Sequence, residues 1–173
     1  MNVLLVEPNF PIPAKSKNHC NFLPIGLLKI AAYHRSLGDR VELHRGNFQA
    51  NTRPEEIKVT SLFTYWSTHV WESVHYYKEL YPSARMEVGG IYASLMPKHA
   101  KASGCDNVKT GLYKKGIAED FEPAYDLVNV DYQIVHGSRG CFRKCNFCGT
   151  WKIEPDVTYK TSIKDEIRKK KIV

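Results

Sequence analysis

Three of the five cysteines in this 173-residue chain lie close together, as Cys141-x3-Cys145-x2-Cys148. Thiolate sulfur is a soft ligand that suits iron–sulfur clusters and zinc. Structural zinc sites take four ligands, usually from two separated pairs, and the sequence offers no matching second pair. Electron-transfer ferredoxins bring a fourth cysteine to each cluster. Three ligands in one loop therefore favour a [4Fe–4S] cluster with one iron open to a substrate, while zinc completed by His136 or a distant cysteine stays the alternative.

The residues around this cysteine loop and the two remaining cysteines have simpler interpretations. Cys20 and Cys105 are isolated, and we expect them to be structural thiols rather than half of a disulfide framework. Four cations flank the loop and would offset the negative charge of a thiolate-bound cluster, although the same positions suit ordinary solvated side chains: Arg139, Arg143, Lys144 and Lys152.

The segments on either side of the cysteine loop predict a strand before it and a helix after it. Residues Tyr132–His136 form the expected strand and lead directly into the loop, as in (β/α) barrels, which present their chemistry at the ends of strands. Ser162 is expected to begin a helix with acidic residues in its first turn, and Ile172-Val173 to begin another strand. Residues 131–173 are therefore interpreted as the incomplete start of a barrel.

Upstream of residue 116, short apolar runs alternate with stretches of helical spacing. Val3–Val6 is typical of a strand buried on both faces, and further strands are expected at 41–43, 59–65, 86–88 and around Val108. Helices are expected from Pro24 to Gly38, over 70–80 and after Pro97. Because the crossovers run to about 15–30 residues, the strands should pair in parallel. The prediction is an open, doubly wound, mostly parallel α/β sheet over residues 1–115, with 116–130 as a linker.

Ligands of such sheets bind beyond the carboxyl ends of the strands. The segments at those ends are Glu7-Pro8-Asn9, Thr64-Tyr65-Trp66 and Gly89-Gly90. The aromatic residues among them, with Trp71, are interpreted as core or rim packing.

Composition places the chain among folded globular proteins, with 43% hydrophobic and 25% charged residues. No apolar run is long enough for a membrane span, and the N-terminus lacks a secretory signal, so we expect a cytoplasmic location. The net charge of +7 is uneven, and its densest run lies at 168–171. We interpret this run as a solvated helix end, and nucleic acid is not an expected partner.

The segment from Gly137 to Cys148, with an aromatic residue before its last cysteine, resembles the signature of radical S-adenosylmethionine (radical SAM) enzymes. The resemblance implies that Cys141, Cys145 and Cys148 each bind one iron of a [4Fe–4S] cluster. S-adenosylmethionine would chelate the fourth iron through its amino and carboxylate groups, with Phe147 against its adenine. An electron donor such as flavodoxin or ferredoxin would reduce the cluster, and a 5′-deoxyadenosyl radical would then take hydrogen from a small-molecule substrate.

Four upstream segments resemble the radical SAM subfamily with an N-terminal cobalamin (B12)-binding-like domain: Pro24–Leu27, Ile30–Tyr33, Val88–Ser94 and Glu122–Asp126. The resemblance implies a flavodoxin-like or B12-binding-like fold that holds cobalamin at the carboxyl ends of its strands, and methyl transfer as one reaction. Gly89 and Gly90 would let a nucleotide tail approach the backbone, or would form a tight turn.

The chain departs from this subfamily in two ways. It lacks the D-x-H-x-x-G loop that gives classical cobalamin domains their cobalt ligand, and neither His19 nor His34 has that context. Only 25 residues follow Cys148, so the rest of a barrel is missing. We therefore expect a fragment or a truncated product that is inactive alone. The alternative function is a corrinoid-binding or other ligand-binding module whose cysteine loop is an electron-transfer or zinc site.

Overall fold

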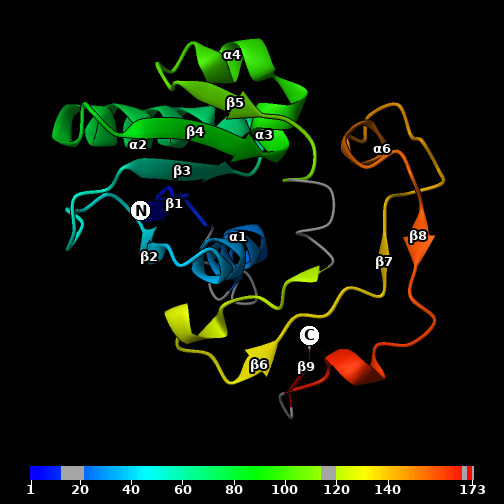
Figure 1. The fold of residues 1–173 in the computed structure, drawn as a ribbon. Helices are drawn as coiled ribbons and strands as arrows, with labels where there is room; N and C mark the ends of the chain where they lie inside the picture. Colours follow the sequence, from blue (N-terminus) through cyan, green and yellow to red (C-terminus); the bar gives the residue numbers. More distant parts are fainter. Residues whose placement is uncertain (13–21, 114–119, 169–170, 173) are drawn as a thin grey trace. The chain divides into compact units, whose positions relative to one another are not determined.

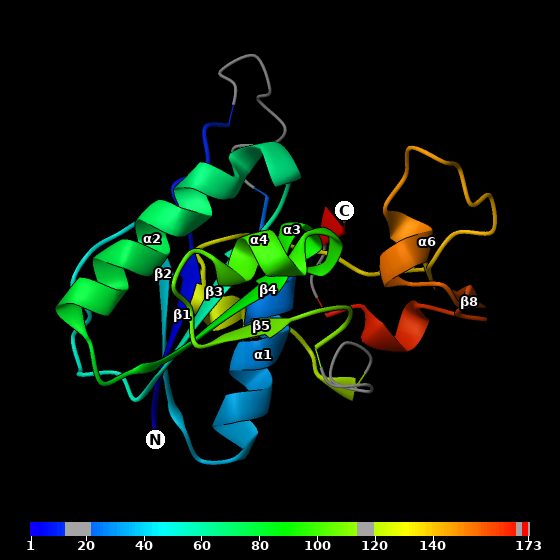
Figure 2. The same cartoon turned by 90° about the horizontal axis from the view of Figure 1, so that it is seen from above.

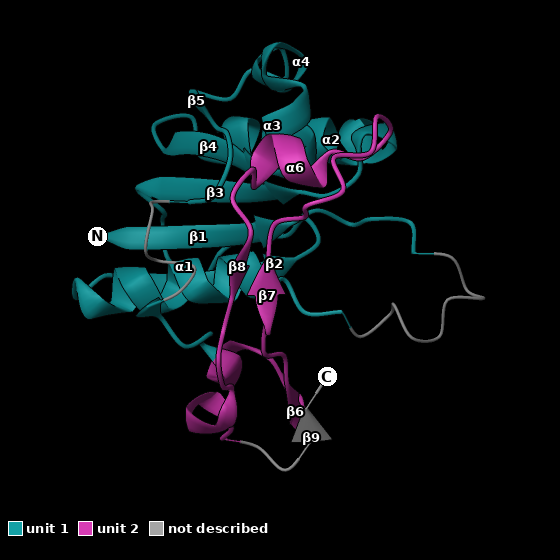
Figure 3. Ribbon diagram, turned by 90° about the vertical axis from the view of Figure 1, so that its right-hand side faces the viewer, with its two compact units in different colours: residues 1–124 teal, residues 125–173 magenta. Residues whose placement is uncertain are grey.

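The computed structural model describes residues 1–12, 22–113, 120–168 and 171–172. The chain divides into two compact units, Met1–Ala124 and Tyr125–Val173 (Figure 3). The division falls inside the segment 116–130 that the sequence suggested as a linker. His19 and Cys20 lie outside the described residues.

In the described part of the first unit, five parallel strands form one sheet in the order β2-β1-β3-β4-β5 (Figure 1). Their bounds are β1 Asn2–Glu7, β2 Arg40–Arg45, β3 Glu56–Ser61, β4 Arg85–Gly90 and β5 Asn107–Lys109. The pairing is parallel throughout, with Leu4 opposite Ile57 and Val59 opposite Val88. This is the flavodoxin-like strand order, which confirms the predicted doubly wound α/β fold.

The helices cover both faces of the sheet, which therefore lies between α1 and α2 in Figure 2. Their bounds are α1 Ile25–Ser36, α2 Ser67–Leu80, α3 Ile91–Leu95 and α4 Pro97–Lys101. Leu4 and Val6 belong to the core cluster that includes residues of α2, α3 and α4. Because successive side chains of a strand point to opposite faces, Val3 and Leu5 are buried on the other face, where α1 packs against β1 and β2.

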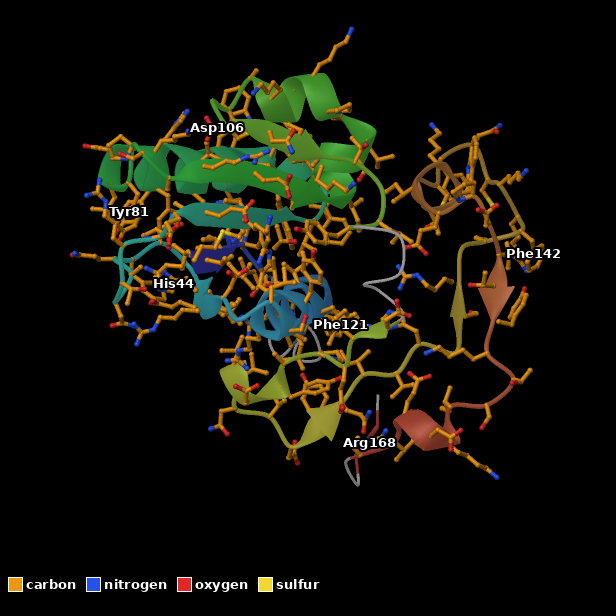
Figure 4. All side chains as sticks on the ribbon, viewed as in Figure 1. His44, Tyr81, Asp106, Phe121, Phe142 and Arg168 are labelled. Atoms are coloured by element: carbon orange, nitrogen blue, oxygen red, sulfur yellow. The ribbon has the colours of Figure 1, made fainter. Side chains whose placement is uncertain are left out.

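A buried polar network fixes the segment after β2 to helix α2. His44 lies between two partners: its Nδ1 is 2.8 Å from the Tyr77 hydroxyl and its Nε2 is 2.6 Å from Glu42 Oε1 (Figure 4). The Tyr77 hydroxyl also lies 3.3 and 3.2 Å from the carbonyl oxygens of Gly46 and Phe48. Burial raises the pKa of Tyr77 to about 12, so the phenol stays protonated and keeps these hydrogen bonds.

A second polar link ties the end of α2 to the start of β4 and to the turn before β5. Both carboxylate oxygens of Asp106 accept hydrogen bonds from Lys78 Nζ, and one also accepts from the Met86 backbone amide. Burial alone would raise the pKa of this carboxyl, but the bonds from Lys78 and Met86 outweigh burial and lower the pKa. The ionised carboxylate therefore stabilises the fold.

The elements described in the second unit are all short. Strand β6, Tyr132–Gln133, pairs in parallel with β9, Lys171–Ile172, and β7, Ser138–Arg139, pairs antiparallel with β8, Thr158–Tyr159. Helix α6 spans Thr150–Ile153, and 3₁₀ turns span Tyr125–Leu127 and Lys164–Glu166. The expected strand 132–136 is thus only two residues long. Ile172 lies in a strand as expected, but β9 begins one residue earlier, at Lys171, and Val173 lies outside the described residues.

The helix expected from Ser162 is absent, and that prediction was wrong. The structure has a single 3₁₀ turn there. The backbone groups that a helix would use are bonded to a side chain instead, because Gln133 Nε2 donates to the Glu166 carbonyl and Gln133 Oε1 accepts from the Arg168 amide. Ile167, on the expected apolar face, is 38% exposed, so packing gives a helix no support here.

No helix in the described part of either unit is both long enough and apolar enough to span a membrane.

Candidate metal centre

The three cysteines of the motif occupy one loop, which runs from the end of β7 to the start of α6. All three are free thiols and partly exposed. Two hydrogen bonds shape the second half of the loop: the Cys148 amide donates to the Cys145 carbonyl at 3.0 Å, and Trp151 Nε1 donates to the same carbonyl at 2.9 Å. The backbone around Cys145 and Cys148 is therefore held by its own contacts.

Glu154 fixes the entry to the cysteine loop. Its Oε1 accepts a hydrogen bond from Arg139 Nη2 at 2.7 Å, and its Oε2 accepts from the Gly140 amide at 3.2 Å. Gly140 has φ +73°, and a Cβ at this position would lie 2.1 Å from the Asp156 carbonyl oxygen. Only glycine fits this approach. The two chain segments that flank the cysteines are thus held against each other.

One thiol of the loop has a perturbed acidity. The Cys148 Sγ lies 3.4 Å from the Thr150 hydroxyl. Hydrogen bonds from the Thr150 hydroxyl and from the Thr150 backbone amide lower the pKa of Cys148. Because the thiolate is the form that binds metals, these contacts favour ligation at Cys148.

The donor set fits an iron–sulfur cluster in its chemistry, but the three side chains do not converge. Among the described residues, no three His, Cys, Asp or Glu side chains are grouped closely enough to hold a metal ion. Ligation therefore requires the side chains of Cys141, Cys145 and Cys148 to turn toward a common point. The loop brings the three sulfur atoms into one segment, and their convergence stays a prediction.

The aromatic residues of the loop face solvent. Phe147, predicted to lie against an adenine, is 94% exposed, and Phe142 is 71% exposed (Figure 4). The adenine contact of Phe147 stays a prediction.

The backbone of the loop is unusual at Lys144, which has a positive φ of 45°. Such a value is uncommon for a residue other than glycine.

The cations around the loop differ in their surroundings. Arg139 is paired with Glu154, and Lys152 Nζ lies 5.5 Å from the centre of the Trp151 ring. Arg143 and Lys144 are exposed. The charge of Arg139 is thus already compensated, and the other cations stay candidates to offset a cluster.

Two residues weighed as further ligands have structural surroundings. Cys105 is buried in the core of the first unit, with its sulfur 3.6 Å from the Ala100 carbonyl oxygen. His34 Nδ1 lies 2.8 Å from Asp39, which also accepts from the N-terminal amine. His34 therefore lies near the amino ends of β1 and β2, away from the edge where such sheets bind ligands. His136 is exposed in the same unit as the loop, so the zinc alternative stays open.

Gly89 and Gly90, predicted as a cofactor approach or a tight turn, lie at the end of β4. Gly90 has φ +102°, and a Cβ there would lie 2.2 Å from the Ser61 carbonyl oxygen. Ser61 Oγ donates to the Gly89 carbonyl and accepts from the Ala93 amide. Gly90 is thus required by the close approach of β3 and β4. For a Cβ at Gly89, the nearest atoms are those of Lys109, at 3.7 Å and beyond. The approach of a nucleotide tail stays a prediction.

Aromatic rings gather at the carboxyl ends of β1 and β3, which are neighbours in the sheet but not in sequence order. Phe10 stacks on Trp66 at 5.3 Å between centroids, and Phe63 stacks on Tyr65 at 5.1 Å. Trp66 joins the packing as expected, but Tyr65 is 70% and Phe63 45% exposed. Phe63 was expected inside the strand at 59–65, but β3 ends at Ser61, so no signal in the sequence indicated that its ring lies at the end of the strand.

The strand order and the loop define the class of this chain: a flavodoxin-like α/β domain followed by a separate unit that carries a three-cysteine loop. No protein-family model matches the chain, and neither does any curated protein.

Among the solved structures that resemble the chain, three show how low the sequence identity is. A cobalamin-binding protein from Desulfitobacterium hafniense is 15% identical with a TM-score of 0.44, over 63% of this chain and 52% of that one. A response regulator from Thermotoga maritima is 13% identical with a TM-score of 0.42, over 73% and 90%. Another from Burkholderia pseudomallei is 17% identical with a TM-score of 0.36, over 62% and 57%. This chain thus spans only 52% of the cobalamin-binding protein. The fold assignment rests on the parallel strand order itself.

Proposed function

We propose that the second unit is the cluster-binding part of a radical SAM enzyme, with Cys141, Cys145 and Cys148 as the protein ligands of a [4Fe–4S] cluster. The observation that carries the proposal is the donor set: three free, partly exposed thiols in one loop. With S-adenosylmethionine bound at its open iron, such a cluster supplies one-electron radical chemistry. The electron donor and the small-molecule substrate follow from this function and are proposed with it.

The residues of the loop have separate tasks in this proposal. Cys148 is ready to ligate because its contacts with Thr150 favour the thiolate. Glu154 and Gly140 hold the base of the loop, while the three cysteine side chains turn toward a common point. Phe147, exposed beside Cys148, offers a flat apolar surface to an adenine ring.

Anaerobic reconstitution of the whole chain with iron and sulfide tests the ligand set. We expect about four iron and four sulfide per chain, as in a [4Fe–4S] cluster, and loss of the cluster in Cys141→Ala, Cys145→Ala and Cys148→Ala. Cys105→Ala is the matched control, because it also removes one thiol but lies in the core of the first unit. Zinc bound in place of iron, or equal iron loss in Cys105→Ala, would overturn the proposal.

Electron paramagnetic resonance of the reduced cluster distinguishes the radical SAM function from plain electron transfer. S-adenosylmethionine should shift the signal, because it binds the iron that the protein leaves open. Phe147→Ala should weaken that response without lowering the iron content. A signal that does not change at saturating S-adenosylmethionine would favour an electron-transfer cluster.

Cobalamin in the first unit is a second candidate, favoured by one observation. The carboxyl ends of β1 and β3 form the point where the strand order reverses, the usual ligand position in such sheets, and exposed aromatic rings of Phe63 and Tyr65 lie there. Hydroxocobalamin should then co-elute with the chain and change its visible spectrum, and Tyr65→Ala should weaken binding. Absence of co-elution would remove cobalamin from the proposal and leave the cluster untouched.

A further inference from the structure

An open pocket of about 400 Å³ lies on the outer side of α2 in the first unit. One stripe of α2 and one residue of α4 line it: Ser67, Thr68, Trp71, Glu72, His75 and His99. Its volume lies in the range of small-molecule sites, about 300–1,000 Å³. None of these residues takes part in the cysteine loop, and the proposed function leaves this pocket without a role.

A hydrogen-bond chain fixes the wall of the pocket. Trp71 Nε1 donates to the Tyr92 hydroxyl at 3.0 Å, and the Tyr92 hydroxyl lies 2.6 Å from His99 Nδ1. An indole N–H only donates, so the Tyr92 oxygen accepts from Trp71 and its proton points to His99. Tyr92 is fully buried, and burial raises its pKa, so it remains a donor. The rings of Trp71 and His99 are thus held in place before any ligand arrives.

Three aromatic rings line the pocket. The centroids of Trp71 and His99 lie 5.1 Å apart with a tilt of 40°, and His75 meets Trp71 edge-on at 6.2 Å. The ring faces are electron-rich, and Trp is the strongest side chain for attracting a cation to its face. Such a wall favours an apolar or cationic ligand over an anionic one.

The charge of the lining favours a cation. With histidines counted as neutral, Glu72 alone among the six lining residues carries a full charge. Its side chain is 66% exposed, and its Oε2 lies 3.3 Å from His69 Nδ1. An anion drawn to the amide groups in the first turn of α2 would meet this carboxylate. A cation would be attracted by Glu72 and by the face of Trp71 together.

We propose that the α2/α4 pocket binds a small organic cation, an amine or quaternary ammonium compound, against the indole of Trp71 and the carboxylate of Glu72. Titration of the whole chain with choline, followed by ligand-observed NMR or calorimetry, tests it. Two comparison ligands are used. The neutral isostere 3,3-dimethylbutan-1-ol has the shape of choline without its charge, and inorganic phosphate carries the opposite charge.

We expect saturable choline binding that is about tenfold tighter than binding of the isostere, the scale of one cation–π or carboxylate contact. Glu72→Gln should weaken choline binding by a similar factor and leave the isostere unaffected. Glu79→Gln is the matched control, because Glu79 is exposed on the same helix but does not line the pocket. Trp71→Phe should weaken choline binding while an unchanged circular dichroism spectrum reports an intact fold.

Three outcomes would overturn the proposal: no saturable choline binding, equal binding of the neutral isostere, or preferential binding of phosphate. The result is independent of iron, sulfide and S-adenosylmethionine, so the pocket and the cysteine loop succeed or fail separately.

Discussion

Replacement of Gly90 by alanine should destabilise the first unit strongly, and the size of the effect follows from two terms. The first is backbone strain: φ +102° and ψ −165° form a conformation that is essentially restricted to glycine, and holding another residue there costs about 1–3 kcal/mol. The second is overlap. A Cβ would lie 2.2 Å from the carbonyl oxygen of Ser61 and 2.9 Å from its nitrogen. Both are backbone atoms of the neighbouring strand, and forced shifts of this kind cost about 1–3 kcal/mol.

The sum for Gly90→Ala, about 2–6 kcal/mol, is a large part of the 5–15 kcal/mol that is typical of a whole domain. Urea unfolding of the whole chain, followed by circular dichroism, measures it. Gly89→Ala is the control, since its Cβ would make only ordinary contacts at 3.7 Å and beyond and alanine suits a strand better by about 0.5–1 kcal/mol. Equal stabilities of the two variants, or a cost of Gly90→Ala below about 0.5 kcal/mol, would refute the reasoning, since surface substitutions reach that size.

Three further variants test other parts of the structure. Gly140→Ala should destabilise the second unit by about 1–3 kcal/mol and lower its iron content after reconstitution, whereas Gly137→Ala, whose Cβ would meet nothing within 4 Å, should do neither. Tyr77→Phe should cost about 1–3 kcal/mol in urea unfolding because it leaves a buried imidazole nitrogen unpaired; a cost below about 0.5 kcal/mol would contradict this. The Asp106 carboxyl has a lowered pKa in the fold, so its stabilisation is present above its ordinary pKa of about 4 and is lost as the pH falls through the folded value. The stability difference between the wild type and Asp106→Asn should therefore shrink in acid, and a difference that grows would contradict the sign.

The fold of the first unit was largely predictable because its signals are local. Val3–Val6 is a continuous apolar run, and the structure buries it on both faces. The predicted helix from Pro24 to Gly38 is α1, Ile25–Ser36. Parallel pairing followed from the length of the connections between strands. A parallel pair needs a long crossover, whereas a short hairpin loop can join only antiparallel strands. The main difference is a shift of β3 toward Glu56, with a 3₁₀ turn at Thr64–Trp66 in place of the strand end.

The second unit was less predictable because distant side chains decide its backbone. The acidic first turn after Ser162 suits a helix, yet Gln133, more than thirty positions earlier, bonds the amide and carbonyl groups that such a helix would need. The spacing of apolar residues within 162–168 contains no information about the contact with Gln133. The same limit applies to the pocket on α2, since the fold alone brings His99 beside Trp71.

In the candidate metal centre, the cysteine motif determines which donor atoms are present, and the fold determines whether they converge. The spacing of the three cysteines fixes the number and kind of donor atoms, and no folding detail can change that count. Whether three thiolates converge depends instead on the backbone between them. Here Glu154 and the contact of Gly140 with Asp156 hold the base of the loop. A loop anchored at its base loses less conformational entropy when its tip closes on a ligand than a free segment does. The cysteine spacing could not predict the contacts of Glu154 and Gly140. These contacts therefore favour metal binding by the three cysteines that the spacing did predict.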